Sequence, residues 1–472
     1  MKKLTLLLLL CFSPCAVSDG LPDLGDVSQA MLTPLQERQI GQQSMMQIRA
    51  SKQYLDDAEI NDYLNQLGAK LVENSPEPSL DFEFFAVNDY SVNAFALPGG
   101  FIGVNAGLLL ITQSESELAS VLSHEISHVT QHHLARMIEG QRGDSLISMA
   151  AIAIAILAAR TSPQAAEATI ASVQAGNIQK QLNFTRANEE EADRIGLQLL
   201  QKSGFNTHAM PEFLERLQNA TRLLDGNAPN YMRTHPITSD RIAEIENRIH
   251  NQPYRLIPDS LDFQLVRTKL IAAQKTAPDA IAYFSDALGA QNYGNPIAQR
   301  YGLVSALLRD NQIERAAQEL ATLRKQAKNS PMIETLAGQV LRATKNYTEA
   351  LAFYRTAVQN FPQHRALIYD YTDLLLQDNQ AGIAVKLLTE QLTRHPMDTT
   401  LYDLQARAYA MQGKILEQHQ AQAYSYAWQG NLHAAIEQLE LAKQAGGNFY
   451  QLSTIESDLR ELREMLDARG KK

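Results

Sequence analysis

Alanine recurs at a fixed step of 34 residues in the second half of the chain. Ala316, Ala350 and Ala384 lie in the helix-like stretches IERAAQEL, YTEALAFY and AGIAVKLL. Helix-breaking prolines recur at nearly the same step, at Pro296, Pro331, Pro362 and Pro396. A small residue at one helical position lets paired helices approach closely, and a proline ends the preceding helix. The second half is therefore predicted to be a stack of helix pairs.

A period of 34 residues with a small residue at a fixed helical position is the signature of tetratricopeptide (TPR) repeats. The stretch GNLHAAIEQLELA, from Gly430, is similar to these repeats but out of register with them. An unrelated helical bundle is the alternative, although fixed intervals rarely arise by chance in sequences without repeats. Clustered prolines and a loss of periodicity from Asn251 to Ser260 predict a linker. We therefore expect a TPR domain over residues 256–465, after a different domain over residues 19–255.

The chain before this linker mixes strand and helix patterns. Residues 81–110 combine aromatic and β-branched residues around a Pro98-Gly99-Gly100 turn, which is typical of strands and a hairpin. Most of the remaining sequence up to residue 250 has apolar residues at helical spacing. The expected fold class is an α+β, mostly helical domain with a small sheet, followed by an all-α TPR superhelix.

The first residues, MKKLTLLLLLCFSPCAVS, predict a secretory signal peptide over residues 1–18. Lipid modification and an uncleaved anchor are the alternatives, but neither Cys11 nor Cys15 follows a small residue, as lipid modification requires. Cleavage would leave no cysteine, so a metal site could use only His, Asp and Glu. The net charge of −10 argues against nucleic acid and favours proteins or peptides as partners.

One other apolar run, from Leu146 to Ala159, is too short for a membrane span, which needs about twenty residues. It is interpreted as a buried or substrate-covering helix. No transmembrane span is expected in the mature chain.

The stretch VLSHEISHVTQHH contains four of the eleven histidines. On a helix, His124 and His128 project from one face at a separation that suits a tetrahedral metal. Glu125 lies at the edge of that face, near enough to reach a water bound to the metal. This H-E-x-x-H pattern on a helix is typical of zinc peptidases. The alternatives are a chance match and a solvated polar face.

The ends of this helix are also predicted. Thr112 and Glu115 form the pattern of a capping box, which is expected to start the helix. His132 and His133 rotate away from the metal-facing side and are interpreted as bystanders on the rim.

A third metal ligand must come from another segment, because catalytic zinc keeps three protein ligands and one open position. In FTRANEEEADRIGLQLL, Glu189 shares its helix face with small and apolar residues, whereas Glu190 and Glu191 share faces with polar or charged ones. Glu189 is therefore the predicted ligand, and the other two are interpreted as solvated. Asp193, one turn later, is placed to accept a hydrogen bond from the far nitrogen of a ligating histidine. A solvated helix start is the alternative for the acidic run.

Three stretches of the chain are similar to the HtpX-like zinc metallopeptidases: NAFALPGGFIGVNAGLL, HEISHVTQHHLAR and EEEADRIG. The resemblance implies a gluzincin-like domain and a third ligand within a Glu-x-x-x-Asp pattern, which falls on Glu189 and Asp193. The order of signal peptide, peptidase domain and TPR array looks like that of periplasmic protease-chaperones of Gram-negative bacteria. That likeness implies misassembled outer-membrane β-barrel proteins as clients and the β-barrel assembly machinery as a partner of the TPR domain.

The resemblance also implies a role for His235, whose family counterpart can close on the zinc and silence the enzyme. His235 lies between the turn-rich stretch DGNAPN and a helix expected to start near Asp240, so its backbone could move. Stabilising the oxyanion and a purely structural role are the two alternatives.

The expected function is an exported, zinc-dependent endopeptidase and chaperone. One Zn2+ per chain, held by His124, His128 and Glu189, would activate a water, with Glu125 as general base. His235 or Arg233 is expected to assist the oxyanion. The alternative function is a TPR-based chaperone or adaptor with a latent protease site. A structural zinc site is disfavoured because it leaves Glu125 without a task.

A substrate-aligning strand is also expected. The strand from Asn93 to Leu97 could pair with an extended substrate through main-chain hydrogen bonds. Such pairing would favour unfolded or misassembled proteins as substrates.

Overall fold

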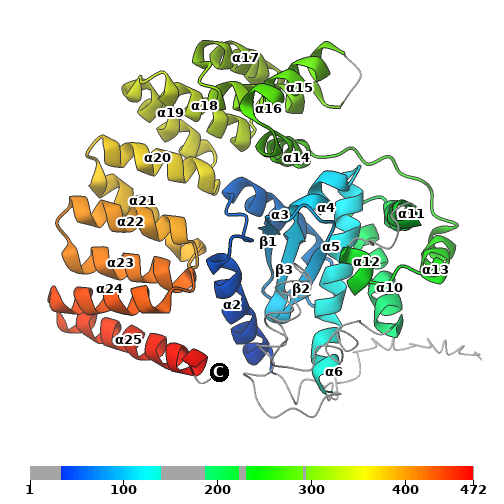
Figure 1. The fold of residues 1–472 in the computed structure, drawn as a ribbon, viewed down its shortest axis with the longest axis horizontal. Coiled ribbons are helices and arrows are strands. Elements are labelled where there is room, and N and C mark those ends of the chain that lie inside the picture. The colour runs from blue at the N-terminus through cyan, green and yellow to red at the C-terminus, as the bar shows by residue number, and fades with distance from the viewer. Residues whose placement is uncertain (1–32, 140–185, 223–229, 291–293, 471–472) are drawn as a thin grey trace, which may run out of the picture.

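The computed structural model describes residues 33–139, 186–222, 230–290 and 294–470. A curved array of helices, green to red in Figure 1, wraps around a smaller domain of helices and three short strands. The expected signal peptide, the apolar run Leu146–Ala159 and most of the stretch DGNAPN lie outside the described residues. Among the described helices, none combines the length and apolar character that crossing a bilayer requires.

The sheet has three strands in the order β1-β3-β2. These strands are β1 (Glu83–Val87), β2 (Ala94–Leu97) and β3 (Phe101–Asn105). β2 and β3 are antiparallel and are joined by the predicted turn at Pro98–Gly100, whereas β1 is parallel to β3. β1 and β2 are therefore the two edges of the sheet within the described part of the chain.

Side chains of a helix cover the outer edge of β1. From α3 (Ala58–Val72), Asn65 both accepts a hydrogen bond from the backbone N of Phe84 (2.9 Å) and donates one to its carbonyl oxygen (2.7 Å). The Asn61 side chain accepts a hydrogen bond from the backbone N of Ala86 at 2.8 Å. These amides occupy the backbone groups through which another strand would pair. The β1 edge is therefore closed to strand addition along Phe84–Ala86.

Helices surround this sheet, and two of them carry the candidate site. α5 (Glu115–Thr130) holds the H-E-x-x-H pattern and α10 (Arg186–Lys202) holds the acidic run. The other helices of the first half are α2 (Pro34–Ala50), α4 (Ala106–Ile111), α6 (His133–Glu139), α11 (Ala209–Arg222), α12 (Asn230–Thr234) and α13 (Ser239–Ile249). The expected α+β, mostly helical first half is confirmed.

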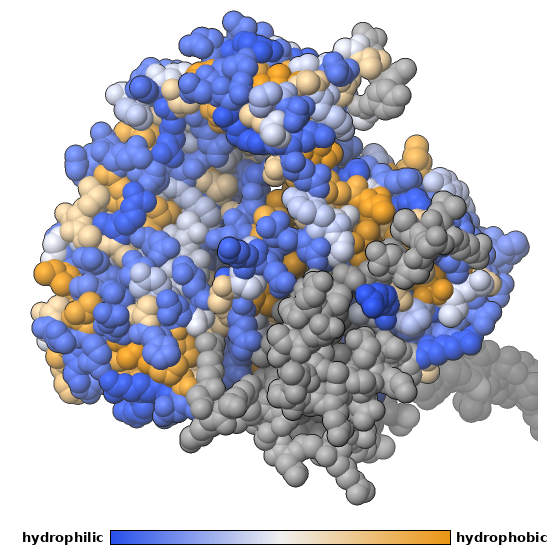
Figure 2. All heavy atoms as spheres, in the orientation of Figure 1, coloured by the Kyte–Doolittle hydropathy of each residue, from blue (hydrophilic) through white to orange (hydrophobic). Residues whose placement is uncertain are grey.

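The second half forms helix pairs, as the 34-residue period predicted. They are α14 (Leu261–Gln274) with α15 (Ala277–Gly289), α16 (Pro296–Arg309) with α17 (Ile313–Gln326), α18 (Pro331–Ala343) with α19 (Tyr347–Asn360), α20 (Arg365–Gln377) with α21 (Ala381–Arg394), α22 (Thr399–Met411) with α23 (Ile415–Trp428), and α24 (Leu432–Gln444) with α25 (Phe449–Gly470). The three periodic alanines are fully buried, in α17, α19 and α21. Hydrophilic residues cover most of the array on the face shown in Figure 2.

A second 34-residue period appears in the turns of the array. Left-handed backbone conformations with positive φ recur at Asn311, Lys345, Asn379 and Gly413. Gly430, where the out-of-register stretch begins, is also left-handed, with a φ of 75°. It lies 17 residues after Gly413, and Ala435 in the following helix is fully buried. The repeat-like stretch therefore copies the turn and alanine of a repeat, shifted by one helix.

The array and the first half share one hydrophobic core. A continuous cluster of buried side chains runs from α3 and the sheet through α5 and α14 to α18. Two smaller clusters fill the later helix pairs. Residues 250–260, where the linker was predicted, contain neither helix nor strand. The linker therefore separates two sequence patterns but not two cores.

Charged side chains also join the two halves. Glu59 of α3 is buried and accepts hydrogen bonds from Lys269 Nζ of α14 (2.6 Å) and from His364 Nε2, next to α20 (3.2 Å). Burial would raise the pKa of Glu59, but the opposing charges and hydrogen bonds of Lys269 and His364 lower it to about 2. Arg365 adds an ion pair with Asp62 at 2.6 Å. These contacts hold α3 against both the first and the fourth helix pair.

The substitution Glu59→Gln should destabilise the folded chain most at neutral pH. Because the folded pKa of Glu59 lies below its ordinary value of 4.5, its contribution is fully present above about pH 4.5 and is lost as the pH falls towards 2. We expect a loss of up to about 3 kcal/mol at pH 7, limited by the partial exposure of Lys269. Urea unfolding measured from pH 7 to pH 3 should show that the difference in free energy of unfolding between the wild type and the variant becomes smaller as the pH falls.

Glu73→Gln is the matched control, because Glu73 lies at the exposed end of the same helix. If Glu59→Gln lowers the free energy of unfolding by the same amount at every pH, the ion pair is not the cause of the destabilisation.

Candidate metal centre

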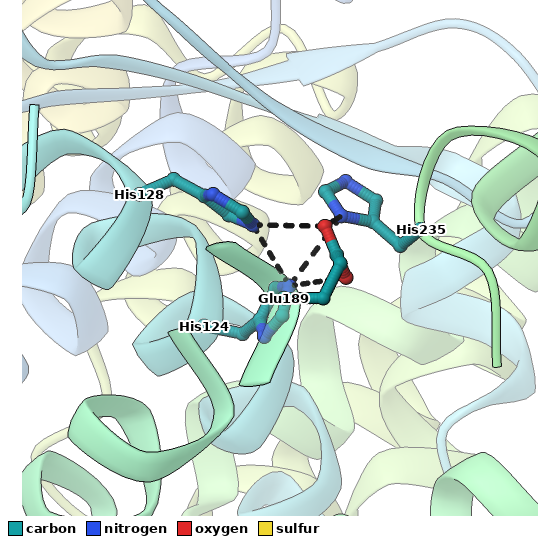
Figure 3. A group of neighbouring side chains, drawn as sticks. All are labelled: His124, His128, Glu189 and His235. Atoms are coloured by element: carbon teal, nitrogen blue, oxygen red, sulfur yellow. Dashed lines mark hydrogen bonds and ion pairs between the residues drawn. The ribbon is translucent and has the colours of Figure 1, made fainter. Parts of the chain in front are cut away.

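Four buried side chains converge on one point inside the first half of the chain. Their ligand atoms, on His124, His128, Glu189 and His235, all lie within 4.8 Å of one another. Figure 3 shows them approaching from three places: α5, α10 and the residue that follows α12. The structure thus brings together the three predicted ligands and the proposed gating histidine.

The distances within this cluster are short. Nε2 of His124 and Nε2 of His128 are 3.0 Å apart. Glu189 places Oε2 3.5 Å from Nε2 of His124 and Oε1 3.5 Å from Nε2 of His128. His235 Nδ1 lies 2.9 Å from Glu189 Oε1. The side chains therefore direct nitrogen and oxygen lone pairs towards a shared space.

A close approach of two helices makes this convergence possible. A Cβ atom added to Gly196 of α10 would lie 3.1 Å from the backbone N of His124 and 3.2 Å from its Cα. Ala192 lies on the same face and is fully buried. The small residues on the Glu189 face therefore let α10 pack against the backbone of α5, as the sequence indicated. A larger residue at position 196 would hold Glu189 away from the histidines.

A buried arginine that the sequence analysis missed organises the carboxylates. Arg241 of α13 donates from Nε and Nη2 to the two oxygens of Asp193, at 2.7 and 2.8 Å. Its Nη1 also lies 2.8 Å from Glu189 Oε2. Asp193 Oδ1 is in turn 3.0 Å from Nδ1 of His124, the nitrogen remote from the cluster. Asp193 thus occupies the place predicted for it, and Arg241 fixes both carboxylates.

The buried charges shift the titration of both helix histidines. Burial alone would lower the pKa of His124, but hydrogen bonds to Asp193 and Glu189 raise it to about 10. The pKa of His128 falls well below its ordinary value because of burial and the charge on His124. In Glu189, burial is outweighed by the charge of His235 and the hydrogen bond from His124, so its pKa falls well below its ordinary value.

Glu125 is fully buried beside the cluster. Its Oε1 lies 3.4 Å from Nε2 of His235, and neither of its oxygens has a hydrogen-bond partner among the described residues. A buried carboxylate without donors is costly unless another group, such as a cation or water, occupies the space beside it. Three imidazoles and one carboxylate, with no sulfur, form a donor set that suits zinc. The residues present therefore fit a metal site.

The structure corrects the interpretation of His133 as a bystander on the rim and of Glu191 as a purely solvated residue. His133 is fully buried, and its Nδ1 lies 2.8 Å from Nδ1 of His128. Glu191, expected on an exposed face, contacts His133 Nε2 at 3.1 Å and Arg136 at 3.0 Å. The helical rotation argument fails because α5 ends at Thr130 and the chain turns at His132, whose φ is 50°. His132 itself is partly exposed and lies 3.4 Å from Glu77.

The predicted capping box at Thr112 is also wrong. The N-cap of α5 is Ser114, whose hydroxyl accepts a hydrogen bond from the backbone N of Glu117 at 3.2 Å. Thr112 instead ends α4. Glu115 accepts a hydrogen bond from the hydroxyl of Ser260 at 2.6 Å and so ties the start of α5 to the start of the array. Arg233, an expected oxyanion partner, is exposed and lies outside the ligand cluster.

Two protein-family models match the chain. Residues 58–249 match peptidase family M48, and residues 341–408 match the tetratricopeptide repeat. The first range includes α5, α10 and α13 and therefore the whole candidate site. The second range lies within the array.

Curated relatives extend this match over nearly the whole chain. A beta-barrel assembly-enhancing protease of Escherichia coli (strain K12) is 32% identical over 428 residues, which cover 90% of this chain and 87% of the relative. A protein of the same name from Yersinia pestis is 32% identical over 419 residues, or 89% and 86% of the two chains. The mitochondrial metalloendopeptidase OMA1 of Schizosaccharomyces pombe is 32% identical over 184 residues, or 39% and 51%. This chain therefore belongs to peptidase family M48, as a metallopeptidase that carries a TPR array.

Proposed function

We propose that this chain is a zinc-dependent endopeptidase that acts on misassembled outer-membrane β-barrel proteins. The observation that carries the proposal is the convergence of His124, His128 and Glu189, with a buried Glu125 beside them. The named function of the full-length relatives supports the choice of substrate.

Each residue of the site has a proposed role. When bound by His124, His128 and Glu189, Zn2+ would supply a Lewis acid and lower the pKa of a water. Glu125 accepts a proton from a water as that water attacks the scissile carbonyl, and it then delivers the proton to the leaving amine. Asp193 accepts a hydrogen bond from Nδ1 of His124 and so holds its Nε2 towards the cluster.

We propose that the described conformation is the closed one. His235 is fully buried and lies within the ligand cluster, with Nδ1 2.9 Å from Glu189 Oε1 and 3.4 Å from His124 Nε2. Four protein donors match a closed site, whereas a catalytic zinc keeps one position open. Withdrawal of His235 would free the place of a substrate carbonyl or water.

The proposed substrate strand is β2, the edge of the described sheet opposite the covered edge of β1. β2 packs against α5, which carries His124 and Glu125. An extended polypeptide paired with this edge would pass close to the reacting groups. This arrangement favours segments that are unfolded, because folded segments have their backbone groups already paired.

The sequence patterns and the names of the relatives support a proposed location and domain division. We propose a signal peptide over residues 1–18, export to the periplasm, a peptidase domain over residues 19–255 and a TPR domain over residues 256–465. The β-barrel assembly machinery is the proposed partner of the array, in line with the names of the relatives.

The substitution Glu125→Gln should reduce proteolysis by roughly 10²-fold or more, because the amide cannot accept the proton. The variant should still bind one zinc per chain, since Glu125 lies outside the ligand cluster. Cleavage of an unfolded reporter protein and metal analysis of the purified variant check both points. Full proteolysis with zinc bound would refute the general-base role.

The substitution His235→Ala should raise the rate at which the reporter protein is cleaved, because it removes the residue that closes the site. Arg233→Ala is the matched control two positions away, where the side chain is exposed. A fall in the cleavage rate of His235→Ala, with zinc retained, would contradict closure and favour the alternative role at the oxyanion.

One observation favours a second candidate function, that of an adaptor. A cavity of about 890 Å³ lies between the first half and the array and contains none of the four clustered ligands. Its lining includes Arg49 and Asp62 from the first half and Arg394 and Asp398 from the array. Nη1 of Arg49 is buried and has no hydrogen-bond partner among the described residues. The charged side chains of both signs along this lining suit a polar chain segment.

Complementation separates the two functions. In cells that lack the wild-type protein, Glu125→Gln should restore outer-membrane protein assembly only in part, because proteolysis is lost while the array is intact. The levels of assembled barrels in the outer membrane measure the rescue. Full rescue would make adaptor binding the main function and proteolysis the secondary one.

A further inference from the structure

His128 is held from outside the ligand cluster by a chain of three side chains. We propose that His133 and Glu191 are positioning residues that fix the tautomer and the ring orientation of His128. This inference rests on the proposed zinc site. It gives a task in metal binding to two residues that are not fixed positions of the H-E-x-x-H and Glu-x-x-x-Asp patterns.

The contacts run outwards from the cluster in a line. Nε2 of His128 faces Nε2 of His124, and its other nitrogen, Nδ1, lies 2.8 Å from Nδ1 of His133. Nε2 of His133 lies 3.1 Å from Oε2 of Glu191, to which Arg136 also donates at 3.0 Å. The two imidazole rings meet at 70°, with centroids 4.9 Å apart. Both rings are buried, and only Glu191 and Arg136 are partly exposed.

Hydrogen-bond chemistry gives this line one direction. Nε2 is the nitrogen of His128 that faces the cluster, and it must be unprotonated to bind a metal. His128 therefore carries its proton on Nδ1 and donates it to His133. Nδ1 of His133 must then be the acceptor, which places the His133 proton on Nε2, where the Glu191 carboxylate accepts it. Arg136 donates a second hydrogen bond to the same carboxylate oxygen. If His133 donated from Nδ1 instead, His128 would have to carry its proton on Nε2 and could not bind a metal.

The other helix histidine has a shorter line of the same kind. His124 Nδ1 contacts Asp193 directly, and Arg241 holds Asp193. In both lines a ligating histidine leads to a carboxylate of α10 and then to an arginine. α10 therefore supplies one ligand and the carboxylate end of both lines, which couples the orientation of the two histidines to the seating of a single helix.

A purely structural role is the competing interpretation, because the same contacts fasten α6 to α10. The two roles differ in what they affect. Fastening α6 contributes to the free energy of unfolding, whereas positioning His128 contributes to the affinity for zinc. Mutation of a hydrogen-bond partner of a metal-ligating residue typically weakens metal affinity by about 10–100-fold.

The experiment compares four variants of the full chain: His133→Leu, His133→Asn, Glu191→Gln and the control Glu190→Gln. Glu190 is the neighbouring carboxylate of α10 and pairs on the surface with Arg186. The dissociation constant for Zn2+ is measured by competition with a chromogenic chelator, and the visible spectrum is recorded with Co2+ in place of zinc. Thermal unfolding of the metal-free proteins is measured in parallel.

We expect His133→Leu to bind zinc about 10–100-fold more weakly and to alter the Co2+ spectrum, with Glu191→Gln showing a smaller loss. His133→Asn should recover part of the affinity, because its side-chain oxygen can accept the hydrogen bond from His128. Glu190→Gln should match the wild type. Glu191→Gln keeps the test valid if the leucine variant does not fold, since this side chain lies at the surface.

Wild-type zinc affinity in folded His133→Leu and Glu191→Gln would overturn the inference, whether or not their thermal stability changed. Failure of the proposed function would look different. In that case the wild-type chain would bind zinc no more tightly than a variant that lacks both His124 and His128.

Discussion

The contact between α5 and α10 is the constraint on which the rest of the site depends. Gly196 brings the backbone of α10 to within van der Waals range of His124, and this closeness lets Glu189 reach the two histidines. Packing alone would leave Glu189 and Asp193 as buried charges. Arg241 offsets them by contacting both, so the seating of α13 is part of the same arrangement. The packing of α5, α10 and α13 therefore both positions the ligands and compensates the buried charges.

The hydrogen bonds beyond the ligands explain how flexible histidine side chains can be held in one orientation at the site. An imidazole has two torsion angles and two possible proton positions, so convergence of the rings does not by itself present the right nitrogen. Asp193 and His133 remove that freedom from the remote sides of His124 and His128. His235 has its backbone tied to Tyr231 only one turn before it and follows a five-residue helix. The residue proposed to move is therefore held by a much shorter element than the residues proposed to stay.

Local periodicity was enough to predict the parts of this protein that lie on one helix or repeat. The shared face of His124 and His128, the choice of Glu189 over its neighbours, and the 34-residue step of the alanines are all local patterns, and the structure places these residues accordingly. Arg241 and His133 were missed because their roles depend on contacts between α10 and the segments around α13 and α6. The rotation argument for His133 assumed a helix that in fact ends at Thr130. The positions of the left-handed turns at Asn311, Lys345 and Asn379 could have been predicted from the repeat, since their spacing equals that of the alanines.

The continuous core from α3 to α18 means that the two sequence patterns do not correspond to two autonomous folding units. An excised catalytic half would present to water the apolar sides of α3 and α4 that α14 now covers. Grafting the array of one relative onto the catalytic half of another would therefore require matched surfaces, including partners for Glu59 and Asp62. Substitutions at this contact in one half are therefore constrained by the side chains of the other half.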